Sequence, residues 1–281
     1  MRKNFAIVVF LSLLFTGVSY AATVGGQADM SIPEESFFSK TKAVKHTLDY
    51  YESEMQMKVG FDTECILEKK FHTSQNITDA RIEGGQNMNL KFSMNYSNVL
   101  EPYVKIGTSD LRVKWKQYGS NIVADTEPGL VLGGGLKAKL LEFPYAGIKL
   151  TLDGQYKDIN LDYDKVKIDG TDSTDSVINE GFNIHEWQVS LIASKKFIFG
   201  MQNSYMVPYA GVTYSNSDAD IDFTHSGTGA VYAIDDASNE DKIGIVLGCD
   251  IAPSLLSWYL LSLELRFINE TAFTLSGTMK F

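Results

Sequence analysis

Apolar and polar residues alternate one by one in many short stretches between residue 55 and the C-terminus, and this period of two constrains the fold most. Successive side chains of a β-strand point to opposite faces, so each stretch predicts a strand with one apolar and one polar face. The last stretch is the clearest, because small or polar residues separate every member of its apolar face. That face carries Phe273, Leu275, Gly277, Met279 and Phe281.

The alternation recurs often enough to predict an all-β chain that folds as a transmembrane antiparallel up-and-down β-barrel. Bacterial single-chain barrels have even strand numbers, and we count about ten strands. A secreted β-sandwich also alternates and is the competing fold. The ten stretches are centred on residues 55–67, 88–96, 104–115, 130–140, 148–161, 187–194, 206–214, 243–251, 259–267 and 273–281.

The links between these stretches alternate in length, as the short periplasmic turns and longer outer loops of such barrels do. Only the last outer link, near Asn269 to Thr271, is unusually short. Short links are expected near residues 97–101, 142–146, 198–203 and 252–256, and long links near 72–82, 117–127, 164–183 and 216–239.

Two stretches change phase along their length. In the third, Val104 and Ile106 share one parity, whereas Leu111, Val113 and Trp115 share the other. A β-bulge near Gly107 would keep both groups on the outer face, and we expect one there. The fifth stretch shifts similarly between residues 148–156 and 159–161.

The N-terminus predicts export. Arg2 and Lys3 precede an apolar run from Phe5 to Phe15, and small residues end at Ala21, which is the pattern of a cleaved signal peptide. We therefore divide the chain into a signal peptide (1–21), a polar N-terminal lead-in (22–54) and the barrel (55–281). The lead-in has helical spacing from Ser39, and it could plug the lumen or serve as a tether, with the tether slightly favoured.

The terminal strand resembles the C-terminal strand of bacterial outer-membrane barrels, whose pattern ends in Phe and is read by the insertion machinery. As a pattern, the segment from Met55 to Phe281 resembles the small outer-membrane barrels typified by the OmpA transmembrane domain and OmpW. This resemblance implies location in the cell outer membrane among its lipids. It also implies periplasmic chaperones and the barrel-assembly machinery as partners during biogenesis.

Charge argues against one class of partner. The chain has a formal net charge of −10, and removal of Arg2 and Lys3 leaves 23 basic against 35 acidic side chains. Nucleic acid is therefore not an expected partner, because phosphate binding needs a basic face. We expect no cofactor, and the sequence leaves the oligomeric state open.

The polar faces place many charged side chains in one lumen. A barrel of eight strands is just filled by side chains, so ten leave only slightly more room. We favour an interior plugged by ion pairs and hydrogen bonds, and keep a narrow charge-selective pore as the alternative. The expected lumen-lining residues are Asp62, Glu64, Arg112, Lys114, Lys137, Lys139, Lys149, Asp153, Glu186, Glu264 and Arg266.

Catalytic and metal motifs are weak. His185 stands beside Glu186 and His225 beside Ser226, but sequence neighbours on a strand face opposite ways. The alternating acids at residues 218–222 lack the Gly and the final Glu of an EF-hand loop. We therefore expect no catalytic, cofactor-binding or metal-binding residues.

The sequence thus predicts a non-enzymatic outer-membrane barrel with a structural or surface-interaction role. Two alternatives stay open: a narrow pore or small-solute transporter of the porin type, and an outer-membrane hydrolase.

Overall fold

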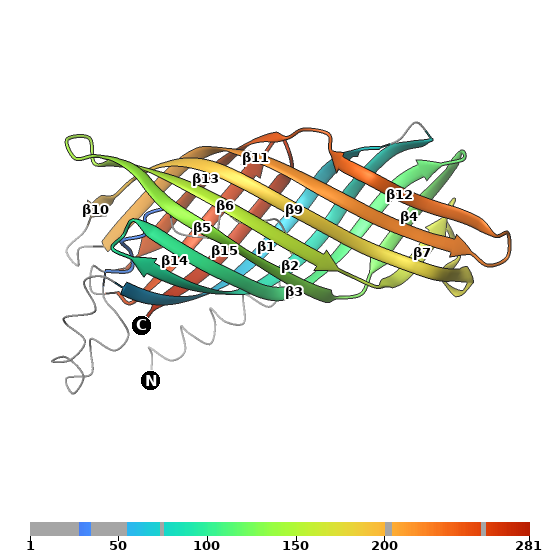
Figure 1. Cartoon of the computed structure of the whole chain (residues 1–281), viewed down its shortest axis with the longest axis horizontal. Coiled ribbons are helices and arrows are strands. Elements are labelled where there is room, and N and C mark those ends of the chain that lie inside the picture. Colours follow the sequence, from blue (N-terminus) through green and yellow to red (C-terminus); the bar gives the residue numbers. More distant parts are fainter. Residues whose placement is uncertain (1–27, 35–54, 74–75, 200–203, 254–256) are drawn as a thin grey trace.

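A computed structural model describes residues 28–34, 55–73, 76–199, 204–253 and 257–281. From Met55 onward these residues form a closed antiparallel β-barrel (Figure 1). The predicted transmembrane barrel with a ring of about ten strands is confirmed, and two stacked sheets are excluded. The ring strands are β1 (Met55–His72), β2 (Ile77–Tyr96), β3 (Leu100–Gln117), β5 (Gly129–Phe143), β6 (Ile148–Asn160), β9 (Val177–Lys195), β11 (Ser204–His225), β13 (Ile243–Ala252), β14 (Tyr259–Phe267) and β15 (Thr271–Lys280).

The last strand closes the ring. β15 pairs antiparallel with β1 from Lys58↔Lys280 to Ile66↔Ala272, and it pairs on its other side with β14. The N–H of Phe281, just past the strand, donates to the Met57 carbonyl at 2.9 Å. The outer face of β15 carries Phe273, Leu275, Gly277 and Met279, as predicted, and its inward side chains are buried.

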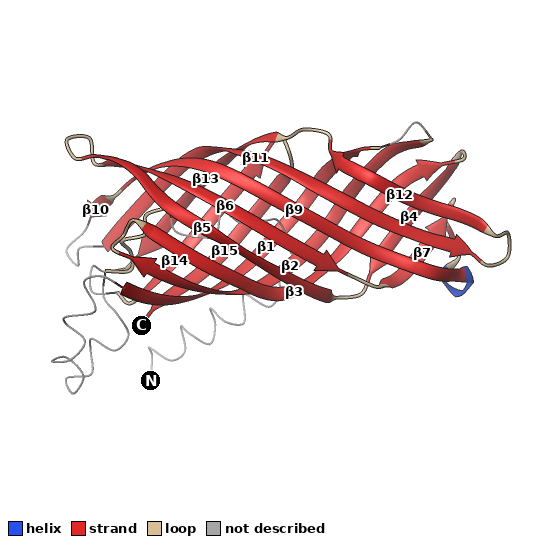
Figure 2. Cartoon of the chain, viewed as in Figure 1, coloured by secondary structure: helices blue, strands red, loops and turns tan. Residues whose placement is uncertain are grey.

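Shorter strands extend the wall at the end opposite the C-terminus, which we call the far end (Figure 1). β4 pairs with β3, and β7 pairs with β4. β12 pairs with β11 and, at Phe71↔Asn239, with β1. Within the described residues, Figure 2 shows helix in one short 3-10 turn there and nowhere else. The remaining elements are β4 (Ser120–Thr126), β7 (Tyr163–Ile168), β8 (Thr171–Asp172), η2 (Thr174–Ser176), β10 (Phe197–Phe199) and β12 (Ala230–Asn239).

Where the structure describes the links, their lengths agree with the predicted rhythm in all but one place, and the short links expected near 198–203 and 252–256 lie partly outside the described residues. Residues 97–99 and 144–147 form short turns at the C-terminal end, and the long links after β3, β6 and β11 carry the extra far-end strands. The link expected near 72–82 is instead short, because β1 continues to His72 and β2 begins at Ile77.

The alternation of β3 runs through Gly107 without a bulge. β3 pairs with β5 in unbroken register from Leu100↔Ala138 to Ser109↔Gly129. Val104 and Ile106 point outward, with 59% and 46% of their surface exposed, whereas Val113 and Trp115 point inward and are fully buried. The predicted bulge near Gly107 is therefore wrong. What changes along β3 is the medium on each side of the wall, since apolar residues face outward in one half and inward in the other.

The same inversion occurs on two other ring strands, β6 and β11. On β6 Tyr156 faces outward and Ile159 is buried inside, with no irregularity in the pairing with β9. On β11 Tyr214 faces outward, and Phe223 is fully buried. The aromatic rings of Trp187 and Tyr214 contact each other at 5.4 Å near this level, where interfacial aromatics gather in membrane barrels.

An exposed apolar belt surrounds the half of the barrel nearer the C-terminus. Soluble proteins rarely expose so large a continuous apolar surface, and lipid chains are its natural environment. Among the residues that the structure describes, no helical segment has the length and apolarity needed to cross a membrane. One exposed belt residue from each ring strand is Phe61, Phe92, Val104, Leu132, Tyr156, Leu191, Val212, Leu247, Leu263 and Met279.

The wall has very different heights around the ring. β1, β2, β3, β9 and β11 have 18 to 22 residues, whereas β13, β14 and β15 have 9 or 10. Above the short strands the wall is continued by β12, which pairs with β11 and with β1. The predicted signal peptide (1–21) and the helical spacing from Ser39 lie outside the described residues.

Candidate functional site in the barrel lumen

Nine of the eleven predicted lumen residues lie on the inward face of the wall. Lys139 and Lys149 stand at the C-terminal mouth and are partly exposed, and Lys139 lies opposite the inward-facing Thr151. The other seven are buried in the interior: Asp62, Glu64, Lys137, Asp153, Glu186, Glu264 and Arg266.

Arg112 and Lys114 lie outside the lumen, contrary to the prediction. Because β3 keeps its alternation past Gly107, these two side chains share the outward face of Val104. Arg112 contacts Asp125 on β4, and Lys114 Nζ lies 3.2 Å from Glu83 on β2. Both belong to the water-facing surface of the far end.

A fully buried ion pair occupies the lumen near the C-terminal mouth. Lys58 Nζ on β1 lies 2.8 Å from Glu101 Oε2 on β3, and Lys91 on β2 approaches the same carboxylate at 3.7 Å. Charges removed from water need such partners, because an unpaired buried charge is strongly destabilising. These contacts link the adjacent strands β1, β2 and β3 through side chains in the lumen.

Tyr103 occupies the next layer of the lumen. Its hydroxyl donates to Asp153 Oδ1 at 2.9 Å, across the barrel interior from β3 to β6. The Lys91 and Lys105 ammonium groups lie 4.6 and 5.8 Å from its ring centroid, within the range of cation–π attraction. Lys105 also lies 3.4 Å from Asp62.

Arg266 on β14 is the centre of a carboxylate cluster farther along the lumen. Its guanidinium lies 3.1 Å from Glu270, 3.5 Å from Glu64 and 3.7 Å from Glu264. The Tyr209 hydroxyl on β11 donates to Glu264 at 2.9 Å. A guanidinium presents donors in several directions at once, which suits it to hold three acids.

Lys69 joins this cluster because of an irregularity in β1. The register with β15 shifts between Ile66 and Glu68, so that Lys69 points inward while Glu68 points out. Lys69 Nζ then lies 2.8 Å from Glu186 and 3.5 Å from Glu270. Lys157 adds a second cation to Glu186 at 3.3 Å.

The sequence prediction missed several members of this network. Glu101 and Lys105 have the parity of inward residues on β3, and Lys157 that of Asp153 on β6, so an extension of each alternating pattern would have found them. Lys69 and Glu270 gave no such signal, because a bulge and a tight link set their direction.

Residues 28–34 lie inside the C-terminal half of the barrel. Ala28, Asp29, Met30 and Ile32 are buried, and Lys149 binds both carboxylate oxygens of Asp29 at 2.9 and 2.8 Å. For these seven residues the structure agrees with the plug interpretation of the lead-in rather than with the tether.

The far half of the interior is filled by an apolar core. Trp115 and Phe223 meet edge to face at 6.1 Å, and Tyr163 contacts Phe223 at 5.8 Å. Interiors packed in this way leave few voids larger than a water molecule. The fully buried members of this core include Val113, Trp115, Ile122, Ala124, Val166, Ala219, Ile221, Phe223, Ile234 and Ala237.

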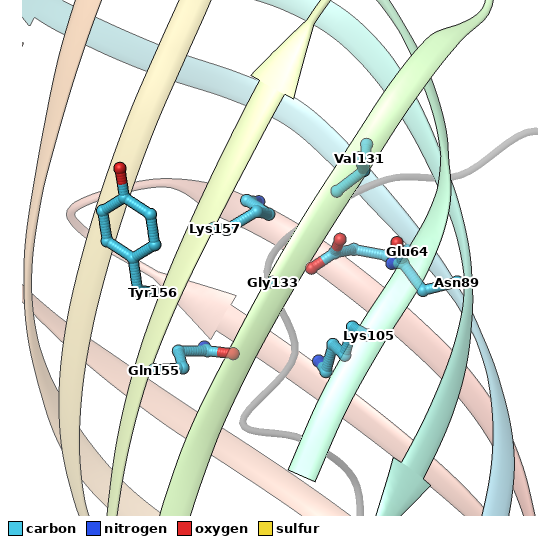
Figure 3. A pocket seen from close by; sticks show the side chains of 8 residues that line it. All are labelled: Glu64, Asn89, Lys105, Val131, Gly133, Gln155, Tyr156 and Lys157. Atoms are coloured by element: carbon cyan, nitrogen blue, oxygen red, sulfur yellow. The ribbon is translucent and has the colours of Figure 1, made fainter.

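A cavity within the polar half measures about 10 Å³, which is close to the space of a single water. Figure 3 shows its lining side chains, which come from β1, β2, β3, β5 and β6. Polar lining alone does not make a path for a solute, since a path also needs continuous free volume. The lining residues are Glu64, Asn89, Lys105, Val131, Gly133, Gln155, Tyr156 and Lys157.

The His pairs considered for catalysis do not form one site. His185 faces outward, with Nδ1 3.0 Å from Asp158, whereas Glu186 faces inward to Lys69. His225 Nδ1 contacts the Thr228 hydroxyl at 3.3 Å at the far end. Within the described ranges, no group of three or more His, Cys, Asp or Glu residues is placed to hold a metal ion.

No protein-family model matches the chain, and neither does any curated protein. Among solved structures, the outer membrane protein OprG from Pseudomonas aeruginosa aligns at 8% identity over 82% of this chain and 96% of its own, with a TM-score of 0.43. The translocator domain of the autotransporter NalP from Neisseria meningitidis aligns at 9% identity over 81% and 87%, with a TM-score of 0.37. The Ralstonia pickettii toluene transporter TbuX aligns at 7% identity over 81% and 88%, with a TM-score of 0.32.

Proposed function

We propose that the protein is a non-conducting, non-enzymatic barrel of the bacterial outer membrane, with a structural or surface-interaction role. The observation that carries this proposal is the filled interior: buried ion pairs occupy the half within the apolar belt, and an apolar core occupies the far half. A solute would have to break charge pairs and then cross a dry core.

The C-terminal end, with its short turns, faces the periplasm in this proposal, and the far end faces outside. Longer outer loops and short periplasmic turns are the usual arrangement in such barrels. Insertion by the barrel-assembly machinery, guided by the terminal segment from Phe273 to Phe281, gives the same orientation.

The far end is suited to present charge to a partner outside the cell. Acidic side chains at residues 218, 220 and 222 line the outward face of β11. Basic side chains lie on the outward faces of β2, β3 and β7, where acids partly pair them. The acidic face of β11 and the mixed, more basic faces of β2, β3 and β7 differ in charge, which favours selective attraction of a charged surface. The basic side chains are Arg81, Arg112, Lys114, Lys116, Lys165 and Lys167.

Planar-bilayer recording of the purified full chain tests the absence of conduction. We expect no stable conductance steps at protein amounts at which an open porin, recorded as the control, gives them. Steady unitary currents from the full chain would overturn the non-conducting assignment and favour the pore.

A Lys116→Cys variant on intact cells tests location and orientation. We expect a membrane-impermeant maleimide to label this exposed far-end position well above the background that Cys65 and Cys249 set in the unmodified chain. If the residue were labelled only after the cells are opened, the far end would not face outside. Either the proposed orientation or the proposed location in the outer membrane would then be wrong.

A further inference from the structure

We propose that the C-terminal half of the lumen is a peptide-binding site, which residues 28–34 occupy in the resting chain. The ligand class is a short acidic peptide with a small residue before an Asp and a branched apolar residue three positions after it. A segment of this chemistry from another periplasmic chain would enter by displacing residues 28–34.

The first support is that buried lumen side chains bind the main chain of the segment. Lys58 Nζ and Asn95 Nδ2 both donate to the Met30 carbonyl, at 2.7 and 2.5 Å. The Thr151 hydroxyl donates to the Ala28 carbonyl at 3.0 Å, and the Ala28 N–H donates to Asp250 Oδ2 at 3.2 Å. Main-chain contacts of this kind accept any sequence and supply affinity.

The second support is a specific contact for the acidic residue. Lys149 on β6 holds both oxygens of Asp29 and also donates to the Ser31 hydroxyl at 3.2 Å. Charge-assisted hydrogen bonds are the strong ones, and here they select a carboxylate at one position. Lys149 is also partly exposed at the mouth, so the contact can be exchanged with solvent.

The third support is an apolar pocket at the correct spacing. Ile32 is completely buried in a cluster with Tyr205, Val207, Ala252 and Leu260, three residues beyond Asp29. Ala28 packs beside Ile192, Tyr209 and Val246, where a larger side chain would have little space. The site therefore selects, in chain order, a small residue, a carboxylate and a branched apolar residue.

The segment lies at an open end, which makes displacement feasible. Lys280 donates to the Glu34 carbonyl at 3.0 Å, and Lys196 contacts the Glu34 carboxylate at the exposed rim. The apolar core seals the other end, so an incoming peptide must arrive from the C-terminal side.

The test uses the full-length barrel in detergent micelles with an Asp29→Lys substitution, which sets the segment against Lys149. A fluorescein-labelled peptide with the sequence of residues 26–34 is the probe, and fluorescence anisotropy measures its binding. We expect saturable binding to the Asp29→Lys barrel and at least tenfold weaker binding to the unmodified chain, whose site is occupied. Equal binding to both chains, or none to the folded variant, would overturn the proposal.

Two controls separate recognition from adsorption. A probe with Asn in place of Asp, or a second substitution Lys149→Ala in the barrel, should each weaken binding about tenfold, which corresponds to about 1.4 kcal/mol. Lys195→Ala, which removes an exposed outward-facing lysine near the same mouth that lies over the Phe197 ring, should leave binding unchanged. If the Asn probe bound more weakly but Lys149→Ala left binding unchanged, the binding would be non-specific adsorption. That result would contradict the proposed site.

A second measurement covers the case in which Asp29→Lys does not fold. In the otherwise unmodified chain, a Ser31→Cys thiol should react slowly with a maleimide and faster when excess unlabelled peptide is added. A rate that the peptide leaves unchanged would also overturn the proposal. Neither readout depends on conductance or on cell surface labelling. A negative result for the peptide site therefore leaves the proposed function intact, and a negative result for the proposed function leaves the peptide site intact.

Discussion

Lys58 Nζ lies 2.8 Å from Glu101 Oε2, and neither side chain has any surface exposed to solvent. This contact joins β1 to β3 through the lumen, past the strand that lies between them in the wall. It shows how the barrel interior is held by charge pairs that have no access to water.

Removal of one partner should therefore cost much of the stability. Glu101→Gln leaves Lys58 and Lys91 facing a neutral group, and loss of a buried partner typically costs about 3–5 kcal/mol. Denaturant titration in lipid vesicles, followed by the gel mobility shift of the folded barrel, measures this free energy of unfolding.

Glu127→Gln, at an exposed position in the link after β4, is the matched control and should change stability by less than about 0.5 kcal/mol. The double variant Lys58→Met/Glu101→Leu should lose less than the sum of its single variants. Full additivity would mean that the two groups do not interact.

The far-end core predicts a second large effect. Trp115 is fully buried among apolar side chains, so Trp115→Ala should cost about 3–5 kcal/mol. The neighbouring Lys116→Ala, on the outward face, should be nearly neutral. Proteolysis of the folded barrel should show the loss as cleavage confined to the far end; an intact far end in Trp115→Ala would contradict the assigned core.

The inversion along β3 predicts opposite responses to charge at two outward positions. Val104→Arg places a charge in the apolar belt, where it costs about 2–4 kcal/mol near the membrane midplane. Lys114→Val, only ten residues later on the same face, should be tolerated because water surrounds it. The fraction of folded protein in the outer membrane measures the effect of each substitution. Equal losses for the two variants would mean that the boundary between lipid and water does not lie between residues 104 and 114.

Glu83, on the water-facing surface of β2, predicts a pH effect. Its partial burial opposes ionisation, but hydrogen bonds from Arg81 at 2.6 Å and Lys114 at 3.2 Å outweigh this and lower the pKa of Glu83 below its ordinary value. A lowered pKa in the folded state gives stability above the unfolded pKa, and this stability is lost as the pH falls through the folded value.

Carboxyl-resolved NMR titration should find the depressed pKa of Glu83, and Arg81→Gln should raise it. Lys165→Gln, whose side chain contacts Asp172 on β8, is the control that should leave the pKa of Glu83 in place. An ordinary pKa of Glu83 in the unmodified chain would contradict the hydrogen bonds assigned to it.

The strand pattern was predictable because each wall residue has only two faces and lipid demands an apolar one. The sequence could not show where the surrounding medium changes, since Val113 and Trp115 look equally suited to lipid or to a dry core. Lys69 was missed for a different reason. A one-residue bulge reverses a strand's faces, and the apolar pair Ile66 and Leu67 followed by three charged residues gives no sign of it.

The unequal height of the wall has a consequence for anything that meets the barrel at the membrane surface. At about 3.4 Å per residue, β11 extends for about 75 Å and β14 for about 30 Å along their own paths. In the proposed orientation a bulky molecule moving along the lipid headgroups would be stopped by the tall flank. Only beside β13, β14 and β15, below the point at which β12 joins β11 to β1, could it reach the short link beside Arg266.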